Sequence, residues 1–140
     1  MYPSAHADSF ARENLPPPEE WPEFLDSPDT RYPQRLNATV ELLDRWVANG
    51  RGEAIALRAP GVRWTYAQLL ERVDAIAHVL REDLGLVPGN RVLLRGSNHP
   101  MMAACLLAVI KAGLVAVPTM PLLRARDLAP VLDKAQVAAA

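Results

Sequence analysis

Cysteine is almost absent from this chain of 140 residues. Cys105 is the single cysteine, so neither an internal disulfide nor a cysteine-based metal site can form. It lies in the apolar run 101–107, where no basic neighbour favours the reactive thiolate, and we interpret it as a core residue rather than a nucleophile. The low cysteine content is typical of a protein in a reducing cytoplasm.

Excess charge and long hydrophobic runs are also missing. The net charge is −1, whereas a protein that binds nucleic acid or an anionic membrane generally carries a concentrated basic face. The longest apolar stretch, residues 101–110, has ten residues, about half the length of a membrane span. The N-terminal residues lack the basic start and apolar core of a secretory signal. We expect a soluble, cytoplasmic protein with neither a nucleic-acid nor a membrane partner.

A glycine-rich phosphate loop is likewise missing from the sequence. There is no Gly-x-Gly-x-x-Gly, and the two lysines, Lys111 and Lys134, do not follow a glycine-rich segment. Such loops hold phosphate groups with backbone N–H groups at the start of a helix. The residues present therefore predict no phosphate-binding loop.

Prolines, acids and aromatics are concentrated near the N-terminus. Residues 1–33 hold seven of the 13 prolines, five of the eight aromatics, and seven acidic residues against two arginines. Proline prevents a continuous helix here, and the apolar content favours an extended arm on a surface over a solvated tail. A partly ordered leader is the alternative. The apolar residues of this arm are Phe10, Leu15, Trp21, Phe24, Leu25 and Tyr32.

Residues 37–85 predict two helices around a hairpin. Asn37 or Thr39 can cap a helix that runs to about residue 48, and residues 54–58 and 62–64 flank a Pro-Gly turn typical of a hairpin. Thr65 and Gln68 then have the spacing of a capping box. The helix that they start is expected to end at Gly85.

The second half of the chain alternates between strand and helix patterns. Short apolar strands are predicted at 91–96, 114–118 and from 137 onward, with helices between them over 100–112 and 128–135, the latter capped by Asp127. This alternation indicates an α/β fold with a parallel sheet and right-handed crossovers. Because the pattern stops as its third strand begins, we expect the 140 residues to be the front of something larger.

Several segments, taken in order and spacing, resemble the opening of AMP-forming acyl-CoA synthetases. They are residues 64–69, 85–92, 98–100 and 108–118, and the resemblance covers about 37–140. It implies that 37–140 form an incomplete N-terminal subdomain of the large domain of an adenylate-forming ligase, after a Pro-rich acidic extension over 1–36. The implied fold is α/β, with short parallel strands alternating with helices plus one β-hairpin.

The extension looks like the aryl-acid branch of this family. Residues 8–17, 32–37 and 120–125 resemble 2-aminobenzoate–CoA and benzoate–CoA ligases. The resemblance implies that ATP, with Mg²⁺, and an aromatic carboxylate give an acyl-adenylate and pyrophosphate, after which CoA thiolate displaces AMP. Two alternatives stay within the family, a fatty acyl-CoA synthetase and a carrier-protein-loading adenylation domain. A third is a stand-alone small α/β domain for binding or assembly.

No catalytic residue or metal ligand of this family can be placed on the present residues. The family carries its chemistry on a phosphate loop ending in lysine, a later aromatic and acidic segment, and a lysine in a small C-terminal domain, and none of these matches here. We therefore expect the 140 residues alone to be inactive and to bind no cofactor. The one candidate contact is Arg124 with a CoA phosphate, although the matching position of related ligases is Leu122; a solvated, helix-leading arginine is the alternative.

Two further features have both a functional and a structural interpretation. Ser97, Asn98 and His99 follow a central strand, where α/β folds often bind ligands, but helix capping accounts for Asn98 and His99 as well. His78 lies one turn after Asp74, which indicates a surface pair rather than acid–base catalysis. An incomplete sheet exposes strand edges and apolar faces, so we expect the chain to self-associate.

Overall fold

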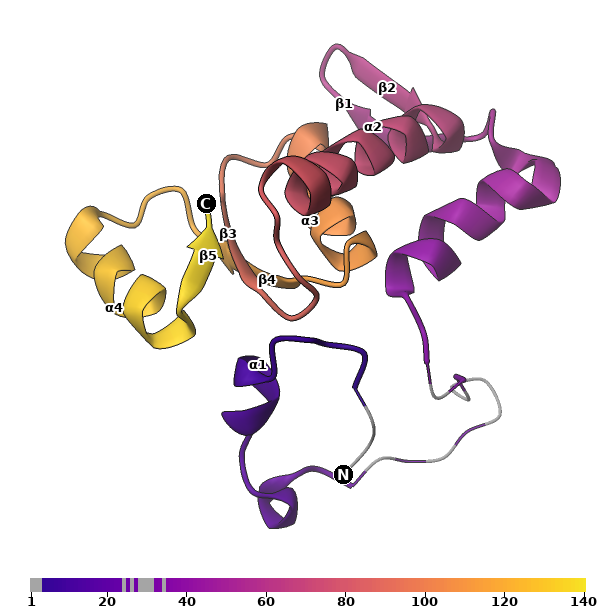
Figure 1. Cartoon of the computed structure of the whole chain (residues 1–140). Helices are drawn as coiled ribbons and strands as arrows, with labels where there is room; N and C mark the ends of the chain where they lie inside the picture. The colour runs from indigo at the N-terminus through magenta and orange to yellow at the C-terminus, as the bar shows by residue number, and fades with distance from the viewer. Residues whose placement is uncertain (1–3, 24, 26, 28–31, 34) are drawn as a thin grey trace.

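The predicted α/β architecture is confirmed in a computed structural model of the chain (Figure 1). It describes residues 4–23, 25, 27, 32, 33 and 35–140. A three-stranded parallel sheet and a separate two-stranded hairpin are connected by helices. Phe24, one of the apolar residues assigned to the N-terminal arm, lies outside the described residues.

Near its start, at residues 7 and 8, the N-terminal arm contacts the rest of the fold. The backbone N–H groups of Ala7 and Asp8 both donate to the carbonyl of Pro88 at 2.9 Å. The short helices α1 (Phe10–Glu13) and η1 (Pro18–Glu20) follow. Farther along, the arm departs from the prediction, because Leu25 and Tyr32 are 85% and 68% exposed. The prediction of an arm on a surface therefore holds near residues 7 and 8 and is wrong for these two side chains.

A helical segment over 38–51 includes two wide turns, η3 (Val40–Asp44) and η4 (Val47–Arg51). The side chain of Asn37 caps it, because its Oδ1 accepts hydrogen bonds from the backbone of Thr39 at 3.1 Å and Val40 at 3.3 Å. Gly50, at φ +77°, breaks the helical conformation where the sequence predicts the stop. Thr39, the alternative cap, is instead buried inside the fold.

The hairpin and the long helix after it form as predicted. Strands β1 (Ile55–Ala59) and β2 (Val62–Thr65) are antiparallel. Helix α2 (Tyr66–His78) continues into η5 (Val79–Asp83). The capping box is confirmed, since Gln68 N donates to Thr65 Oγ1 at 3.2 Å and Thr65 N donates to Gln68 Oε1 at 3.1 Å. Gly85 then takes the left-handed conformation at φ +62°.

The parallel sheet has the order β4-β3-β5, with β3 in the centre. Helix α3 connects β3 to β4, and α4 connects β4 back across β3 to β5. Because these two connections run in opposite directions along the sheet, α3 and α4 lie on opposite sides of it (Figure 1). The first three residues of β3 are buried, as expected for a strand that is covered on both faces. The elements are β3 (Arg91–Arg95), α3 (Pro100–Lys111), β4 (Val115–Thr119), α4 (Ala125–Ala135) and β5 (Val137–Ala139).

The start of α4 differs from the prediction. The helix begins at Ala125 rather than Leu128, and Asp127 is its third residue instead of its cap. The Asp127 carboxylate accepts a hydrogen bond from the backbone N–H of Arg124 at 3.2 Å. Asp127 therefore does accept a hydrogen bond from a free backbone N–H at this helix start, but it does so from the first turn of the helix and not from the position before it.

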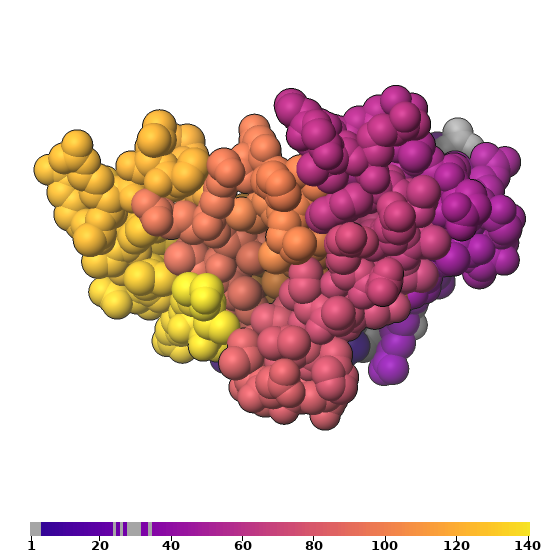
Figure 2. All heavy atoms as spheres, turned by 90° about the horizontal axis from the view of Figure 1, so that it is seen from above, coloured from indigo at the N-terminus to yellow at the C-terminus, as the bar shows by residue number. Residues whose placement is uncertain are grey.

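The core consists of two clusters that share α3. The first joins α3 to the sheet and to η5, and the second joins α3 to α2 and the 38–51 segment. In the space-filling view, α4 lies at one end of the molecule and residues 38–51 at the other (Figure 2). The buried members are Leu80, Leu86, Val92, Val109, Ala112 and Leu114 in the first cluster, and Leu43, Leu69, Val73, Ala104 and Ala108 in the second.

Lys111 ties three helices together at the end of α3. Its ammonium forms ion pairs with Asp44 of η3, at 2.6 Å, and with Asp74 of α2. Asp74, which the sequence predicts as a partner of His78, thus pairs with Lys111 instead. Asn37 adds hydrogen bonds from its side-chain amide to the carbonyls of Ile110 and Lys111 at 3.3 and 3.0 Å. Within the described part of the chain, no helix has both the length and the apolar content to cross a membrane.

Candidate functional site

The carboxyl ends of β3 and β4 lie side by side, because Arg95 and Thr119 are the last paired residues of the two parallel strands. The loops that follow, 96–99 and 120–124, therefore leave the sheet at the same edge. In open α/β sheets this edge is where ligands usually bind. Ser97, Asn98 and His99 are all exposed there, so the structure brings these three candidates to the edge that also leads to Arg124.

Arg95 holds the loop 120–124 in place. The sequence alone did not predict this role. Its Nη2 donates to the main-chain carbonyls of Pro121 at 2.7 Å and Leu123 at 3.0 Å. The partners are carbonyl groups 26 and 28 positions away, and any residue supplies a carbonyl, so no side-chain pattern marks them. The only signal is an arginine that ends an otherwise apolar strand.

Arg124 stands at the end of this fixed loop. It is exposed and precedes α4. Among the described residues, no carboxylate forms an ion pair with its guanidinium, whereas Nε of its neighbour Arg126 lies 3.5 Å from Asp127 Oδ1. An exposed guanidinium on a loop that is held in place can pair with an anionic group such as a phosphate. Leu122, two positions earlier in the same loop, is 84% exposed.

His99 has a structural role at this edge. Its Nδ1 accepts a hydrogen bond from the backbone of Met101 at 3.1 Å, and Pro100 is the first residue of α3. The predicted capping of α3 is therefore confirmed for His99. Asn98 is exposed one position before this cap.

Cys105 and the lysines do not form a reactive centre. Cys105 is half-buried in α3, and burial raises the pKa of its thiol, which disfavours the thiolate that a nucleophile needs. Lys111 is held by two carboxylates, and Lys134 is exposed on α4. Across residues 4–23, 25, 27, 32, 33 and 35–140, no group of three His, Cys, Asp or Glu side chains could hold a metal ion.

Residues 43–140 match the family described as AMP-binding enzyme. The chain belongs to this family. The match begins in the 38–51 helical segment and includes the hairpin and the whole parallel sheet. The resemblance to AMP-forming acyl-CoA synthetases is thereby confirmed, and acyl- and aryl-CoA ligases are among the relatives.

Three curated relatives show the range of this AMP-binding family. Benzoate–CoA ligase of Thauera aromatica is 34% identical over 103 residues, covering 71% of this chain and 19% of the ligase. Long-chain-fatty-acid–CoA ligase of Salmonella typhimurium is 32% identical over 114 residues, covering 81% and 20%. A plipastatin synthase polypeptide of Bacillus subtilis is 34% identical over 125 residues, covering 89% and 5%. The chain spans at most about a fifth of the length of these relatives.

Solved structures of this family share the fold. ATP-bound MatB from Rhodopseudomonas palustris has a TM-score of 0.66 at 25% identity, over 72% of this chain and 20% of that structure. The N-terminal subdomain of Klebsiella oxytoca NpsA, in complex with anthranilyl-AMSN, has a TM-score of 0.63 at 27% identity, over 69% and 25%. The anthranilate CoA ligase AuaEII, in complex with anthranoyl-AMP, has a TM-score of 0.66 over 71% and 19%, but at 22% identity it supports the fold alone.

Proposed function

We propose that this chain supplies the N-terminal part of an AMP-forming acid–thiol ligase. In this reaction ATP and a carboxylate give an acyl-adenylate and pyrophosphate, and CoA thiolate then displaces AMP. The observation that carries the proposal is the AMP-binding family match over residues 43–140, with acyl- and aryl-CoA ligases among the relatives. The division into an extension over 1–36 and an α/β subdomain over 37–140 belongs to the same proposal.

The acid that we propose is aromatic, of the benzoate or 2-aminobenzoate type. The supporting observations are the relationship to benzoate–CoA ligase and the resemblance of residues 8–17 and 32–37 to the aryl-acid branch. The similarity to a long-chain-fatty-acid–CoA ligase and to a plipastatin synthase favours the second candidates, a fatty acyl substrate or an acid loaded onto a carrier protein.

Within such an enzyme, we assign residues 1–140 a framework role. The described residues contain neither a metal-binding cluster nor a lysine at the end of a glycine-rich loop, so ATP and its Mg²⁺ would be held by other parts of the enzyme. The 140 residues alone are therefore expected to be inactive. A cytoplasmic location agrees with the single cysteine and with a reaction that uses ATP and CoA.

Arg124 is the residue that we propose for substrate contact. Its exposed guanidinium follows a loop that Arg95 holds by two hydrogen bonds. A guanidinium pairs favourably with phosphate oxygens in a two-point geometry, so Arg124 would bind a phosphate group of CoA. The residue would act in the second half-reaction and not in adenylation.

The test is acid-dependent pyrophosphate exchange. The complete coding sequence that contains residues 1–140 is expressed, and its protein is assayed with benzoate, 2-aminobenzoate, a long-chain fatty acid and a panel of amino acids, with the 140-residue chain as a matched control. Exchange with the aromatic acids, followed by thioester formation with CoA, is the expected result. Exchange with a fatty acid or an amino acid alone would replace the aromatic proposal with the corresponding second candidate. No exchange with any acid would contradict the ligase proposal itself.

A further inference from the structure

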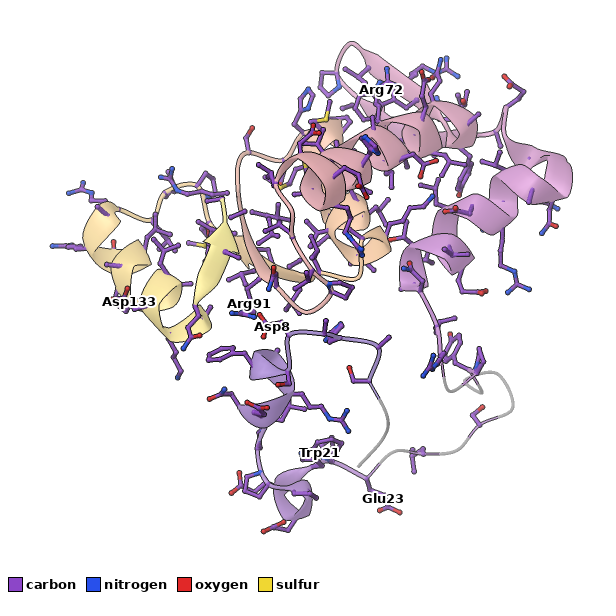
Figure 3. The ribbon with its side chains drawn as sticks, in the orientation of Figure 1. Asp8, Trp21, Glu23, Arg72, Arg91 and Asp133 are labelled. Atoms are coloured by element: carbon purple, nitrogen blue, oxygen red, sulfur yellow. The ribbon has the colours of Figure 1, made fainter. Side chains whose placement is uncertain are left out.

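Arg91, the first residue of β3, is a buried charge with partners from three parts of the chain. Its side chain is 7% exposed. Nε donates to the carbonyl of Ala135 at 2.8 Å, Nη2 to the carbonyl of Gln136 at 2.9 Å, and Nη1 to the carbonyl of Gly89 at 3.1 Å. Nη1 also forms an ion pair with Asp8 (Figure 3). One guanidinium thus connects the N-terminal arm to the turn between α4 and β5.

Several contacts hold the N-terminal arm against the Arg91 guanidinium. Asp8 Oδ2, which pairs with Arg91, also accepts a hydrogen bond from Asn90 Nδ2 at 2.8 Å, and Asp8 Oδ1 accepts one from the backbone of Phe10 at 3.0 Å. The ring of Phe10 lies 4.6 Å from the Arg91 guanidinium carbon, in a cation–π arrangement. The arm backbone approaches so closely that a Cβ at Gly89 would lie 2.2 Å from the carbonyl oxygen of Asp8.

On the other side of Arg91, strand β5 has few contacts of its own. It contains three residues at an edge of the sheet, and its pairing with β3 is limited to Arg91 with Val137 and Val92 with Ala139, with an irregularity between them. The two hydrogen bonds from Arg91 go to the carbonyls of Ala135 and Gln136, immediately before this strand. They therefore add to the strand pairing and to the packing of Ala139 against the first core cluster, which also hold β5 at this edge.

We propose that residues 7–10 form a clasp whose docking holds the α4–β5 turn on the sheet through Arg91. Among the described residues, Asp8 is the only carboxylate that pairs with this guanidinium. A buried guanidinium without a counter-charge is strongly unfavourable, so when the arm leaves, Arg91 turns toward water and releases the carbonyls of Ala135 and Gln136. Because such coupling is reciprocal, loss of the α4–β5 turn also weakens the arm.

Hydrogen–deuterium exchange on the whole 140-residue chain tests the clasp. Asp8→Asn removes the counter-charge and keeps the size of the side chain. We expect exchange to become faster by about tenfold or more both in residues 4–12 and in residues 136–139, with α2 and α3 unchanged. Glu19→Gln is the matched control, because it makes the same chemical change at an exposed position of η1 in the same arm. It should leave both segments unchanged.

A milder variant keeps the test decisive if Asp8→Asn folds poorly. Phe10→Leu retains the ion pair and removes only the ring over the guanidinium, and it should accelerate exchange in the same two segments to a smaller extent. Faster exchange in residues 4–12 without a change in 136–139 would overturn the proposal, since the arm would then leave without affecting the turn. Uniform acceleration through α2 and α3, or no acceleration of the arm, would overturn it as well.

Discussion

The hydroxyl of Thr39 donates a 2.7 Å hydrogen bond to the main-chain carbonyl of Leu107. Thr39 is fully buried, and this bond joins the 38–51 segment to the middle of α3. Replacing Thr39 with valine removes the hydroxyl and keeps the shape of the side chain. Because a buried hydrogen bond of this kind contributes a net amount near 1 kcal/mol, we expect Thr39→Val to lower the free energy of unfolding by about 1 kcal/mol in urea titrations.

Thr39→Ser is the matched control for this contact. Serine keeps the donor and loses only the buried methyl group, so its loss of stability, about 1 kcal/mol, measures packing and not the hydrogen bond. A valine variant as stable as the parent protein would show that the hydrogen bond does not stabilise this position.

Two arginines face each other across the hairpin. Arg58 of β1 pairs with Arg63 of β2, and both are exposed. Like charges directly opposite each other destabilise an antiparallel pair, so Arg63→Thr should raise the free energy of unfolding by about 0.2–1 kcal/mol. Thermal unfolding at low salt is the measurement. Arg58→Thr should give a similar gain and the double variant little more; two fully additive gains would rule out mutual repulsion as the cause.

The ion pair between Asp8 and Arg91 predicts a pH dependence at the acidic end. The backbone hydrogen bond from Phe10 and the hydrogen bond from Arg91 lower the pKa of Asp8 below its ordinary value of 3.8. A carboxyl group with a lowered pKa in the folded state contributes stability above its unfolded pKa, and that contribution is lost as the pH falls through the folded pKa. The difference in melting temperature between the parent chain and Asp8→Asn should therefore be constant above about pH 5 and shrink below about pH 4. A difference that does not change over this range would contradict the assignment.

For the whole ligase, Arg124→Ala tests the proposed CoA contact. Loss of a charge-assisted bond to phosphate should raise the KM for CoA by about tenfold. Pyrophosphate exchange should stay unchanged, because CoA takes no part in adenylation. Arg126→Ala, at an exposed neighbour that already contacts Asp127, should alter neither quantity. Unchanged CoA kinetics in the Arg124 variant would remove this role.

The isolated chain should self-associate. Strands β4 and β5 are the two edges of the parallel sheet, and Met101, Met120 and Leu122 are 41%, 63% and 84% exposed. Unpaired strand edges together with exposed apolar side chains favour association. Light scattering at increasing protein concentration should therefore show dimers or larger species. A monomer at all concentrations, with cooperative unfolding, would instead support a stand-alone binding domain.

Local sequence signals predicted the elements of the fold because each depends on neighbouring residues. Thr65 and Gln68 are three positions apart, and the helix between them and Gly85 follows from capping and apolar spacing alone. The boundary of α4 was the exception. Asp127 caps equally well from the position before a helix or from its first turn, and the sequence does not distinguish these two arrangements.

Contacts between distant residues could not be read in the same way. Asp8 and Arg91 are separated by 83 positions, and Arg95 contacts main-chain carbonyls, which every residue has. Their partners depend on how the arm and the loops are placed in space, which periodicity does not describe. From the sequence, the candidate site could be located only at the ends of the strands. The hydrogen bonds that hold the loop 120–124 were found only in the structure.

The docked N-terminal arm restricts which residue can stand at position 89, where the chain has glycine. Its φ of +95° already disfavours other residues, and the carbonyl of Asp8 occupies the space that a side chain would need. In family members whose chain begins after the arm, asparagine could tolerate this backbone conformation and the space above it would be open. A comparison of sequences at this position would therefore separate relatives whose N-terminal arm packs on the sheet, which need glycine here, from relatives without such an arm, which do not.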